Sequence, residues 1–195
     1  KNLQLKVFSV GNATNPVAAG EAGTVWDIET IHPVPARELL FLGGRTGVHV
    51  YSITNRVAPV PVAQLVHARA WDPVVVQGDH AYVTLRGVVD AGPFSRLEVI
   101  AISNLTNMQV VTNVAMDAPS GLAAAGDHLY VCDWYAGLEI FNIAVPGAIF
   151  RAGGLSDVSG NDVIIAGSLL ILTGGSTVAL YDISDPVNPV FLSGL

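Results

Sequence analysis

A short strand-like pattern recurs along the chain about every 40 to 50 residues, and this repetition limits the possible folds more than any other feature. In each copy the first, third and last of six residues are aliphatic, whereas the second and fifth are polar or small. Such alternation is typical of a half-buried β-strand, with second residues such as His49 on the exposed side, and does not fit a helix. The five copies are Leu5–Val10, Val48–Ile53, Leu97–Ile102, Leu138–Ile143 and Val178–Ile183.

A second recurring unit lies between these strands and consists of two apolar segments joined by a tight turn. Gly78–His80 and Gly126–His128 are the same turn in successive repeats. In the earliest copy His32–Arg37 replaces this turn, and its two prolines are expected to prevent regular strand pairing. Each repeat therefore contains four short strands. The clearest apolar pairs are Pro73–Val83, Leu122–Val131 and Val163–Leu172.

Four-stranded sheets of this length cannot cover both of their faces alone, whereas sheets arranged radially as blades cover one another. The sequence therefore predicts an all-β fold, a β-propeller, with the strands of each blade lettered A to D from the axis outward. The chain opens with the C and D strands of a half-blade and continues through four complete blades of a single domain. The expected bounds are 1–20 for the half-blade and about 25–66, 72–115, 121–152 and 162–193 for the blades, within a domain of residues 1–195.

The turn and strand motifs resemble those of the LVIVD-repeat family of β-propeller proteins. The segments that carry the resemblance include Gly126–Val131, Gly137–Ile143 and Leu180–Val190, and the likeness extends over nearly the whole chain. These motifs specify strand ends and turns, so they imply an architecture and say little about chemistry. Because the family is largely secreted or surface-attached, the resemblance implies a secreted or cell-surface protein.

The half-blade lacks its A and B strands, and an exposed strand edge invites pairing with another chain. Three arrangements would cover it. Residues beyond Leu195 supply the missing strands, a longer parent protein carries further blades on both sides, or another chain pairs with the edge. We favour a fragment of a larger propeller, or a propeller that another polypeptide completes, over a closed four-bladed wheel.

Composition and charge exclude several classes of protein. Nine Lys and Arg against sixteen Asp and Glu give a formal net charge of −7, which would repel a nucleic-acid backbone. The longest apolar stretch, Val163–Thr173, is about half as long as the roughly 20 residues that a membrane-spanning helix needs. A single cysteine, Cys132, excludes an internal disulfide, so the fold must depend on packing.

Candidate binding residues fall on the propeller face that carries the D–A links and B–C loops. Aromatic residues and arginine suit protein and carbohydrate interfaces, because they bury large areas and keep a polar group. Trp26 and Trp71 occupy equivalent positions, so an alternative is that both wedge between blades, whereas Trp134 and Tyr135 have no equivalent elsewhere. The longest B–C loop, Arg86–Arg96, is an insertion on the same face. The candidates are Trp26, Trp71, Arg86, Phe94, Arg96, Trp134 and Tyr135.

Three aspartates, Asp27, Asp72 and Asp162, begin A strands and would ring the mouth of the central channel. Carboxylate oxygens suit Ca²⁺ or Mg²⁺. The dense spacing of a calcium loop is missing, however, and aspartates at such positions more often bind local backbone N–H groups. We therefore expect no cofactor, with Ca²⁺ or Mg²⁺ at these aspartates as the alternative.

The sequence contains no recognisable catalytic motif, and its five histidines are scattered over different repeats. Two segments, Asn12–Thr14 and Asn104–Thr106, match the glycan-acceptor pattern, although Asn and Thr are also common in turns. The chain has only two lysines and one cysteine, a composition that favours an extracytoplasmic location.

We interpret the chain as a non-enzymatic, extracytoplasmic propeller that contacts a protein or a glycan through the face bearing the tryptophans. One alternative is a hydrolase or lyase whose channel aspartates hold a metal or substrate. Another is a structural protein whose open ends let chains assemble. Neither nucleic acid nor a membrane span is expected.

Overall fold

The computed structural model describes residues 4–24, 28–44, 46–66, 70–86 and 95–195, apart from the side chains at 24 and 70–73. Within these ranges the chain forms 18 strands in five antiparallel sheets, which confirms the predicted all-β propeller with four complete blades and a half-blade. The half-blade contains β1 (Gln4–Ser9) and β2 (Val17–Thr24). Blade 1 contains β3 (Ile28–Val34), β4 (Leu39–Gly44), β5 (Gly47–Ser52) and β6 (Val60–Leu65). Blade 2 contains β7 (Ala70–Gln77), β8 (His80–Leu85), β9 (Arg96–Ala101) and β10 (Gln109–Ala115). Blade 3 contains β11 (Pro119–Ala125), β12 (His128–Asp133), β13 (Gly137–Asn142) and β14 (Phe150–Leu155), and blade 4 contains β15 (Asp162–Ala166), β16 (Leu169–Gly174), β17 (Thr177–Asp182) and β18 (Val190–Gly194).

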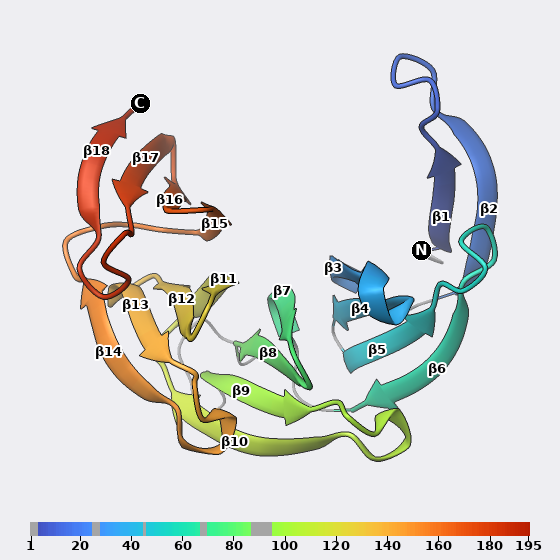
Figure 1. Cartoon of the computed structure of the whole chain (residues 1–195), viewed down its shortest axis with the longest axis horizontal. Coiled ribbons are helices and arrows are strands. Elements are labelled where there is room, and N and C mark those ends of the chain that lie inside the picture. Colours follow the sequence, from blue (N-terminus) through green and yellow to red (C-terminus); the bar gives the residue numbers. More distant parts are fainter. Residues whose placement is uncertain (1–3, 25–27, 45, 67–69, 87–94) are drawn as a thin grey trace.

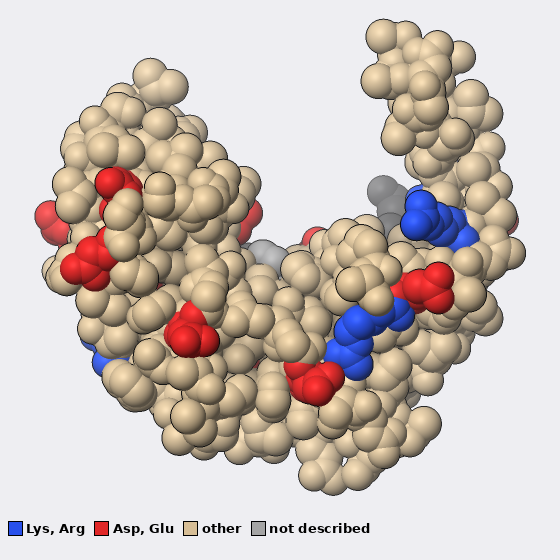
Figure 2. All heavy atoms as spheres, viewed as in Figure 1, with Lys and Arg blue, Asp and Glu red and all other residues tan. Residues whose placement is uncertain are grey.

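The blades fan out along an open arc, with the first strand of each complete blade inside and the last on the perimeter (Figure 1). The inner strands β3, β7, β11 and β15 contact one another in that order and surround the central axis. A wide opening separates blade 4 from the half-blade, and the space-filling view shows the same opening (Figure 2). Blades 1, 2 and 3 therefore each lie between two neighbours.

The core consists of apolar layers between adjacent blades, because side chains of a strand point alternately to its two faces. Strand β12 illustrates this arrangement. Its residues Leu129 and Val131 pack against blade 2, whereas Tyr130 and Cys132 pack against blade 4. All four side chains are fully buried. A strand covered on both faces needs apolar residues at consecutive positions, which explains the uninterrupted apolar runs in the sequence.

Polar contacts also join neighbouring blades. The guanidinium group of Arg37 in blade 1 donates to the backbone oxygen of Ile102 (3.1 Å) and pairs with Asp79 (3.4 Å), both in blade 2. Acidic and basic side chains meet over this seam in Figure 2. The Tyr130 hydroxyl of blade 3 donates to the backbone oxygen of Pro186 in blade 4 (3.0 Å). Such bonds fix the rotation of one blade against the next.

The expectation that the prolines of blade 1 prevent regular pairing was wrong. Pairing between β3 and β4 continues through Pro33, which lies opposite Leu40. Strand β3 is the innermost strand and pairs on one side only, so a residue without an N–H group is tolerated there. The chain reverses instead through the 3₁₀ helix η1 (Pro35–Arg37) and Glu38, whose φ is 54°.

The C strands of blades 1 to 3, β5, β9 and β13, are covered on both faces, which corrects the expectation that they are half-buried, whereas β1 and β17 keep exposed residues. Their second residue faces the preceding blade, and Glu98 and Glu139 are only 3% and 9% exposed at this position. His49, expected on an exposed side, is partly buried. The reason is tertiary, since the preceding blade covers a surface that an isolated sheet would leave to solvent.

Candidate functional site

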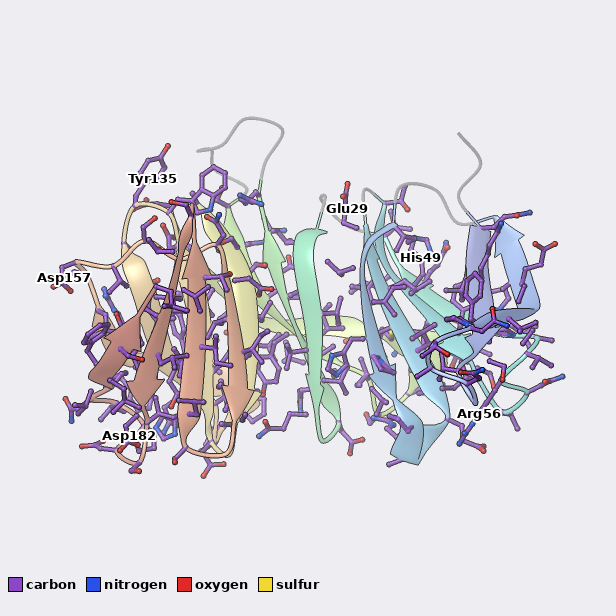
Figure 3. The ribbon with its side chains drawn as sticks, turned by 90° about the horizontal axis from the view of Figure 1, so that it is seen from above. Glu29, His49, Arg56, Tyr135, Asp157 and Asp182 are labelled. Carbon is purple, nitrogen blue, oxygen red and sulfur yellow. The ribbon has the colours of Figure 1, made fainter. Side chains whose placement is uncertain are left out.

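The two faces of the arc carry different kinds of connection. We call the side with the D–A links and B–C loops the loop face; Tyr135 and Glu29 lie on it, whereas Arg56 and Asp182 lie on the opposite, turn face (Figure 3). Tyr135 projects away from the ends of the strands. Tyr135 thus lies on the face where the sequence places it, and Trp134 directly precedes it in the chain.

Several predicted site residues fall outside the described part of the chain. Trp26, Asp27 and Phe94 belong to this group. Trp71 and Asp72 lie within β7, but their side chains are not among those described. The proposed ring of three aspartates and the wedging role of the first two tryptophans stay predictions.

Arg86 and Trp134 are brought together across the seam between blades 2 and 3. Arg86 follows β8 and is 9% exposed, and its guanidinium carbon lies 4.8 Å from the centroid of the Trp134 ring. This geometry is a cation–π contact, which holds the ring against the protein. Trp134 and its neighbour Tyr135 nevertheless keep 46% and 67% of their surface exposed. We call Arg86, Trp134 and Tyr135 the aromatic cluster.

Asp133 holds the backbone beneath the aromatic cluster. One carboxylate oxygen accepts the N–H groups of Asp117 and Ala118 (3.0 Å each), and the other accepts those of Tyr135 (3.0 Å) and Ala136 (3.2 Å). The residue is 1% exposed. Four bonds from two separate loops to one buried carboxylate fix the B–C loop of blade 3 against the D–A link before it.

Arg96, predicted to join the tryptophans, is engaged elsewhere. Its Nε and Nη2 atoms lie 2.7 Å and 2.6 Å from Oε1 of the buried Glu98. Ser95, Arg96, Glu98, Asn113 and Ala115 line a hollow of about 230 Å³. Arg86 and Arg96 thus serve two different environments on blade 2.

Glu139 occupies in blade 3 the repeat position that Glu98 occupies in blade 2. Its Oε1 atom lies 3.0 Å from Nη1 of Arg151. Burial raises the pKa of the Glu139 carboxyl above its usual value; the Arg151 guanidinium opposes this shift, while the charges of Asp133 and Asp117 add to it. Both aspartates and Glu139 line a smaller hollow of about 160 Å³.

Asp162 binds a backbone N–H group of its own strand, as the sequence predicts for an aspartate at the start of an A strand. Its Oδ1 atom accepts the N–H of Val163 at 2.9 Å, and burial raises the pKa of its carboxyl although that hydrogen bond lowers it. Asp162 and His32 line a hollow of about 380 Å³ beside the inner strands. Among the residues that the structure describes, no three His, Cys, Asp or Glu side chains gather as a metal site.

The two glycan-acceptor patterns form the same local structure. The side-chain oxygen of Asn12 accepts the backbone N–H (3.1 Å) and hydroxyl (2.8 Å) of Thr14, and Asn104 and Thr106 repeat both bonds at the same distances. In both segments the asparagine therefore stabilises a turn, which accounts for the Asn and Thr residues there.

Sequence analysis missed the polar hollow at Glu98 and the role of Asp133. The signal for the hollow is a glutamate at the second position of a C strand, where blade 3 also has a glutamate, Glu139, and the other repeats have Lys6, His49 and Ala179. Nothing local indicates that Asp133 receives bonds from a loop about 15 residues earlier in the chain.

Comparisons with known proteins agree with this fold. The LVIVD repeat family model matches residues 68–116 and 119–148. No curated protein matches the chain significantly. Among solved structures, the periplasmic gluconolactonase PpgL of Pseudomonas aeruginosa is 11% identical, with a TM-score of 0.72 over 97% of this chain and 62% of that one.

Two further structures give the same result. A provisionally assigned 6-phosphogluconolactonase from Bacteroides fragilis is 12% identical, with a TM-score of 0.72 over 97% of this chain and 64% of that one. A protein of unknown function from Desulfotomaculum acetoxidans is 12% identical, with a TM-score of 0.62 over 98% of this chain and 76% of that one. At such low identity these similarities show the fold alone.

The chain spans less than two thirds of the length of the Bacteroides and Pseudomonas proteins. In the part of the chain that the structure describes, no helix is long and apolar enough to cross a membrane. The strand order and the blade packing identify the chain as a β-propeller, and its middle part contains matches to the LVIVD repeat.

Proposed function

We propose that this propeller is an extracytoplasmic binding platform, secreted or at the cell surface, that contacts a protein or a glycan through the aromatic cluster. The observation that carries the proposal is the exposed pair Trp134 and Tyr135 on a backbone fixed by Asp133. Large aromatic side chains on a rigid loop lose little conformational entropy on binding. Arg86 beneath the Trp134 ring adds the residue type that interfaces favour.

The test uses a double variant, Trp134→Ala with Tyr135→Ala, and a matched control, Phe150→Ala. Phe150 is also an exposed aromatic residue (58%), but it lies on the perimeter strand β14. Native protein and both variants are applied to a glycan array and, separately, to an array of purified extracellular proteins. A ligand retained by native protein and control but lost by the folded double variant supports the proposal. Ligands retained equally by all three proteins would refute it.

A hydrolysis assay that includes the same double variant tests the enzymatic alternative. The gluconolactonase neighbours suggest lactones as the first substrates to try, although their likeness extends only to the fold. Lactone hydrolysis by native protein that Asp162→Asn abolishes and the double variant preserves would favour a hydrolase over a binding platform.

We also propose that the outward face of blade 4 docks another blade of the same repeat type. Ile171 and Leu180 form a cross-strand pair in blade 4, at the repeat positions of Tyr130 and Ile140 in blade 3. Tyr130 and Ile140 are fully buried against blade 4. The equivalent face of blade 4 is open, and Ile164 on β15 is 54% exposed. An apolar face that continues an interface already repeated in the arc suits the same kind of partner.

In a solution of this chain alone, the available blade belongs to a second copy. We therefore expect concentration-dependent association by light scattering, which Ile171→Glu abolishes. Val62→Glu is the control, because Val62 is exposed on the perimeter strand β6. A native protein that stays monomeric at high concentration, or an Ile171→Glu variant that associates as native does, would refute the docking face.

A further inference from the structure

The hollow beside Glu98 is built by facing residues of two neighbouring strands. Glu98 pairs with Asn113 and Arg96 pairs with Ala115 across β9 and β10, so these side chains share one face of blade 2. Ile100, two residues beyond Glu98 on β9, belongs to the core layer between blades 1 and 2. The hollow therefore lies on the side of blade 2 that faces blade 1, about 230 Å³ in volume.

Two polar atoms in this hollow are buried without a hydrogen-bond partner. Glu98 is 3% exposed, and while its Oε1 atom receives both bonds from Arg96, its Oε2 atom receives none. Ser95 is 4% exposed, and its hydroxyl also has no partner. Native proteins rarely leave such atoms unsatisfied, because burying them without a partner is costly. The two atoms indicate that something else completes the site.

The propeller scaffold does not require a carboxylate at this position. The equivalent residue is His49 in blade 1 and Ala179 in blade 4, and both blades form the same four-stranded sheet. In blade 3 the equivalent Glu139 is paired with Arg151, and it has no buried oxygen atom that lacks a hydrogen-bond partner. Blade 2 is thus specialised at a point where the fold accepts other residues.

The chemistry of the lining restricts the ligand. The carboxylate oxygen of Glu98 can only accept a hydrogen bond, whereas Arg96 donates and the Ser95 hydroxyl and Asn113 amide can do either. The charges of Glu98 and Arg96 compensate each other, so a neutral ligand suits the hollow best. Hydroxyl groups both donate and accept hydrogen bonds, so they suit every group of this lining. A water molecule in the liquid occupies only about 30 Å³, and the hollow of about 230 Å³ therefore has room for a larger molecule. We propose that the hollow binds a neutral polyhydroxylated molecule the size of one sugar residue.

This inference does not depend on the aromatic cluster, since none of its three residues lines the hollow. The test measures binding of a panel of neutral monosaccharides and cyclic polyols to the native 195-residue protein by saturation-transfer NMR and calorimetry. We expect saturable binding of at least one of them, weakened tenfold or more by Glu98→Gln and by Ser95→Ala. The Trp134→Ala variant should bind the same sugar as native protein does.

The matched control is Glu139→Gln, which breaks a Glu–Arg pair at the same repeat position without altering this hollow. It should leave sugar binding unchanged. If Glu98→Gln fails to fold, Ser95→Ala alone decides, because it removes only one hydroxyl. Three results would overturn the proposal: absence of binding across the panel, only ordered water in the hollow of a crystal soaked with these sugars, or equal loss of binding in Glu139→Gln. Tighter binding of a charged amino sugar or sugar acid would overturn the neutral class.

Discussion

Asp133 and Ala118 are joined by a 3.0 Å hydrogen bond, in which the backbone N–H of Ala118 donates to Oδ2 of the buried carboxylate. Three further N–H groups bind the same side chain. This single residue therefore ties the entry of blade 3 to the loop that presents the aromatic cluster.

Replacing Asp133 with Ala should lower the free energy of unfolding by about 3 kcal/mol or more, since each buried donor left unsatisfied costs roughly 1–3 kcal/mol. Urea denaturation followed by circular dichroism measures the change. Asp133→Asn should lie between native and Ala, because the amide keeps one oxygen acceptor. Asp157→Ala removes an exposed aspartate near the start of the next D–A link and should have little effect. An unaltered Asp133→Ala protein would contradict the clamp.

Gly121→Ala should destabilise the contact between blades 3 and 4. A Cβ atom at Gly121 would lie 2.2 Å from Oδ1 and 2.5 Å from Cα of Asp162, so the inner strands would have to separate. Overpacking of this kind costs about 1–3 kcal/mol. Thermal unfolding of the variant is compared with that of Gly147→Ala, where a Cβ atom meets no atom within 4 Å. Equal melting temperatures for the two variants would show that the blades are not in close contact there.

The free energy of unfolding should decrease when the pH is lowered below about 6.5, because of His32. Burial lowers the pKa of His32 below its usual value of 6.5, and its Nε2 atom accepts the N–H of Val76 at 3.4 Å. The unfolded chain therefore binds a proton more readily, so the contribution of His32 is complete above pH 6.5 and is lost as the pH drops through the lowered pKa.

His32→Gln keeps a hydrogen-bond acceptor but does not titrate. Its unfolding free energy should vary less than that of native protein between pH 7.5 and pH 5, measured by urea denaturation at each pH. Identical pH profiles for the two proteins would rule out a contribution from His32.

Arg151→Ala should raise the pKa of Glu139 further, because it removes the cation that opposes the effect of burial. A carboxyl with a raised pKa stabilises the fold fully below its usual value of 4.5, and this contribution is lost as the pH rises through the raised pKa. The variant should therefore lose more stability than native protein between pH 4.5 and pH 7. Since Arg151 is half exposed, we expect a difference below about 1 kcal/mol. Carbon NMR titration of the Glu139 carboxyl gives the pKa directly, and an unchanged value would contradict the assignment.

Much of the fold could be predicted because its signals are local and repeated. The alternation in Leu138–Ile143 and the glycine turn at Gly126, where φ is 55°, each specify a strand or a reversal within a few residues. Five similar copies then leave few ways to bury the apolar faces. The error at Pro33 arose because a proline rule for paired strands was applied to a strand that pairs on one side only.

The candidate site was less predictable, since its contacts join residues from different repeats. The sequence placed Trp134 and Tyr135 on the loop face, and the structure adds the partner beneath the ring, Arg86, 48 positions earlier in the printed sequence. Arg96 looked like part of the same set, yet it pairs with Glu98, two residues away on the same strand.

The amino-acid order alone determined the repeated four-stranded unit and its radial arrangement, because hydrophobic period and turn residues act over short distances. Only the tertiary structure decided which polar groups are buried, such as Glu98 and Asp133, and which atoms in the hollow lack a partner. Burial depends on the neighbouring blade that covers a face, and that neighbour is about forty residues away in the chain.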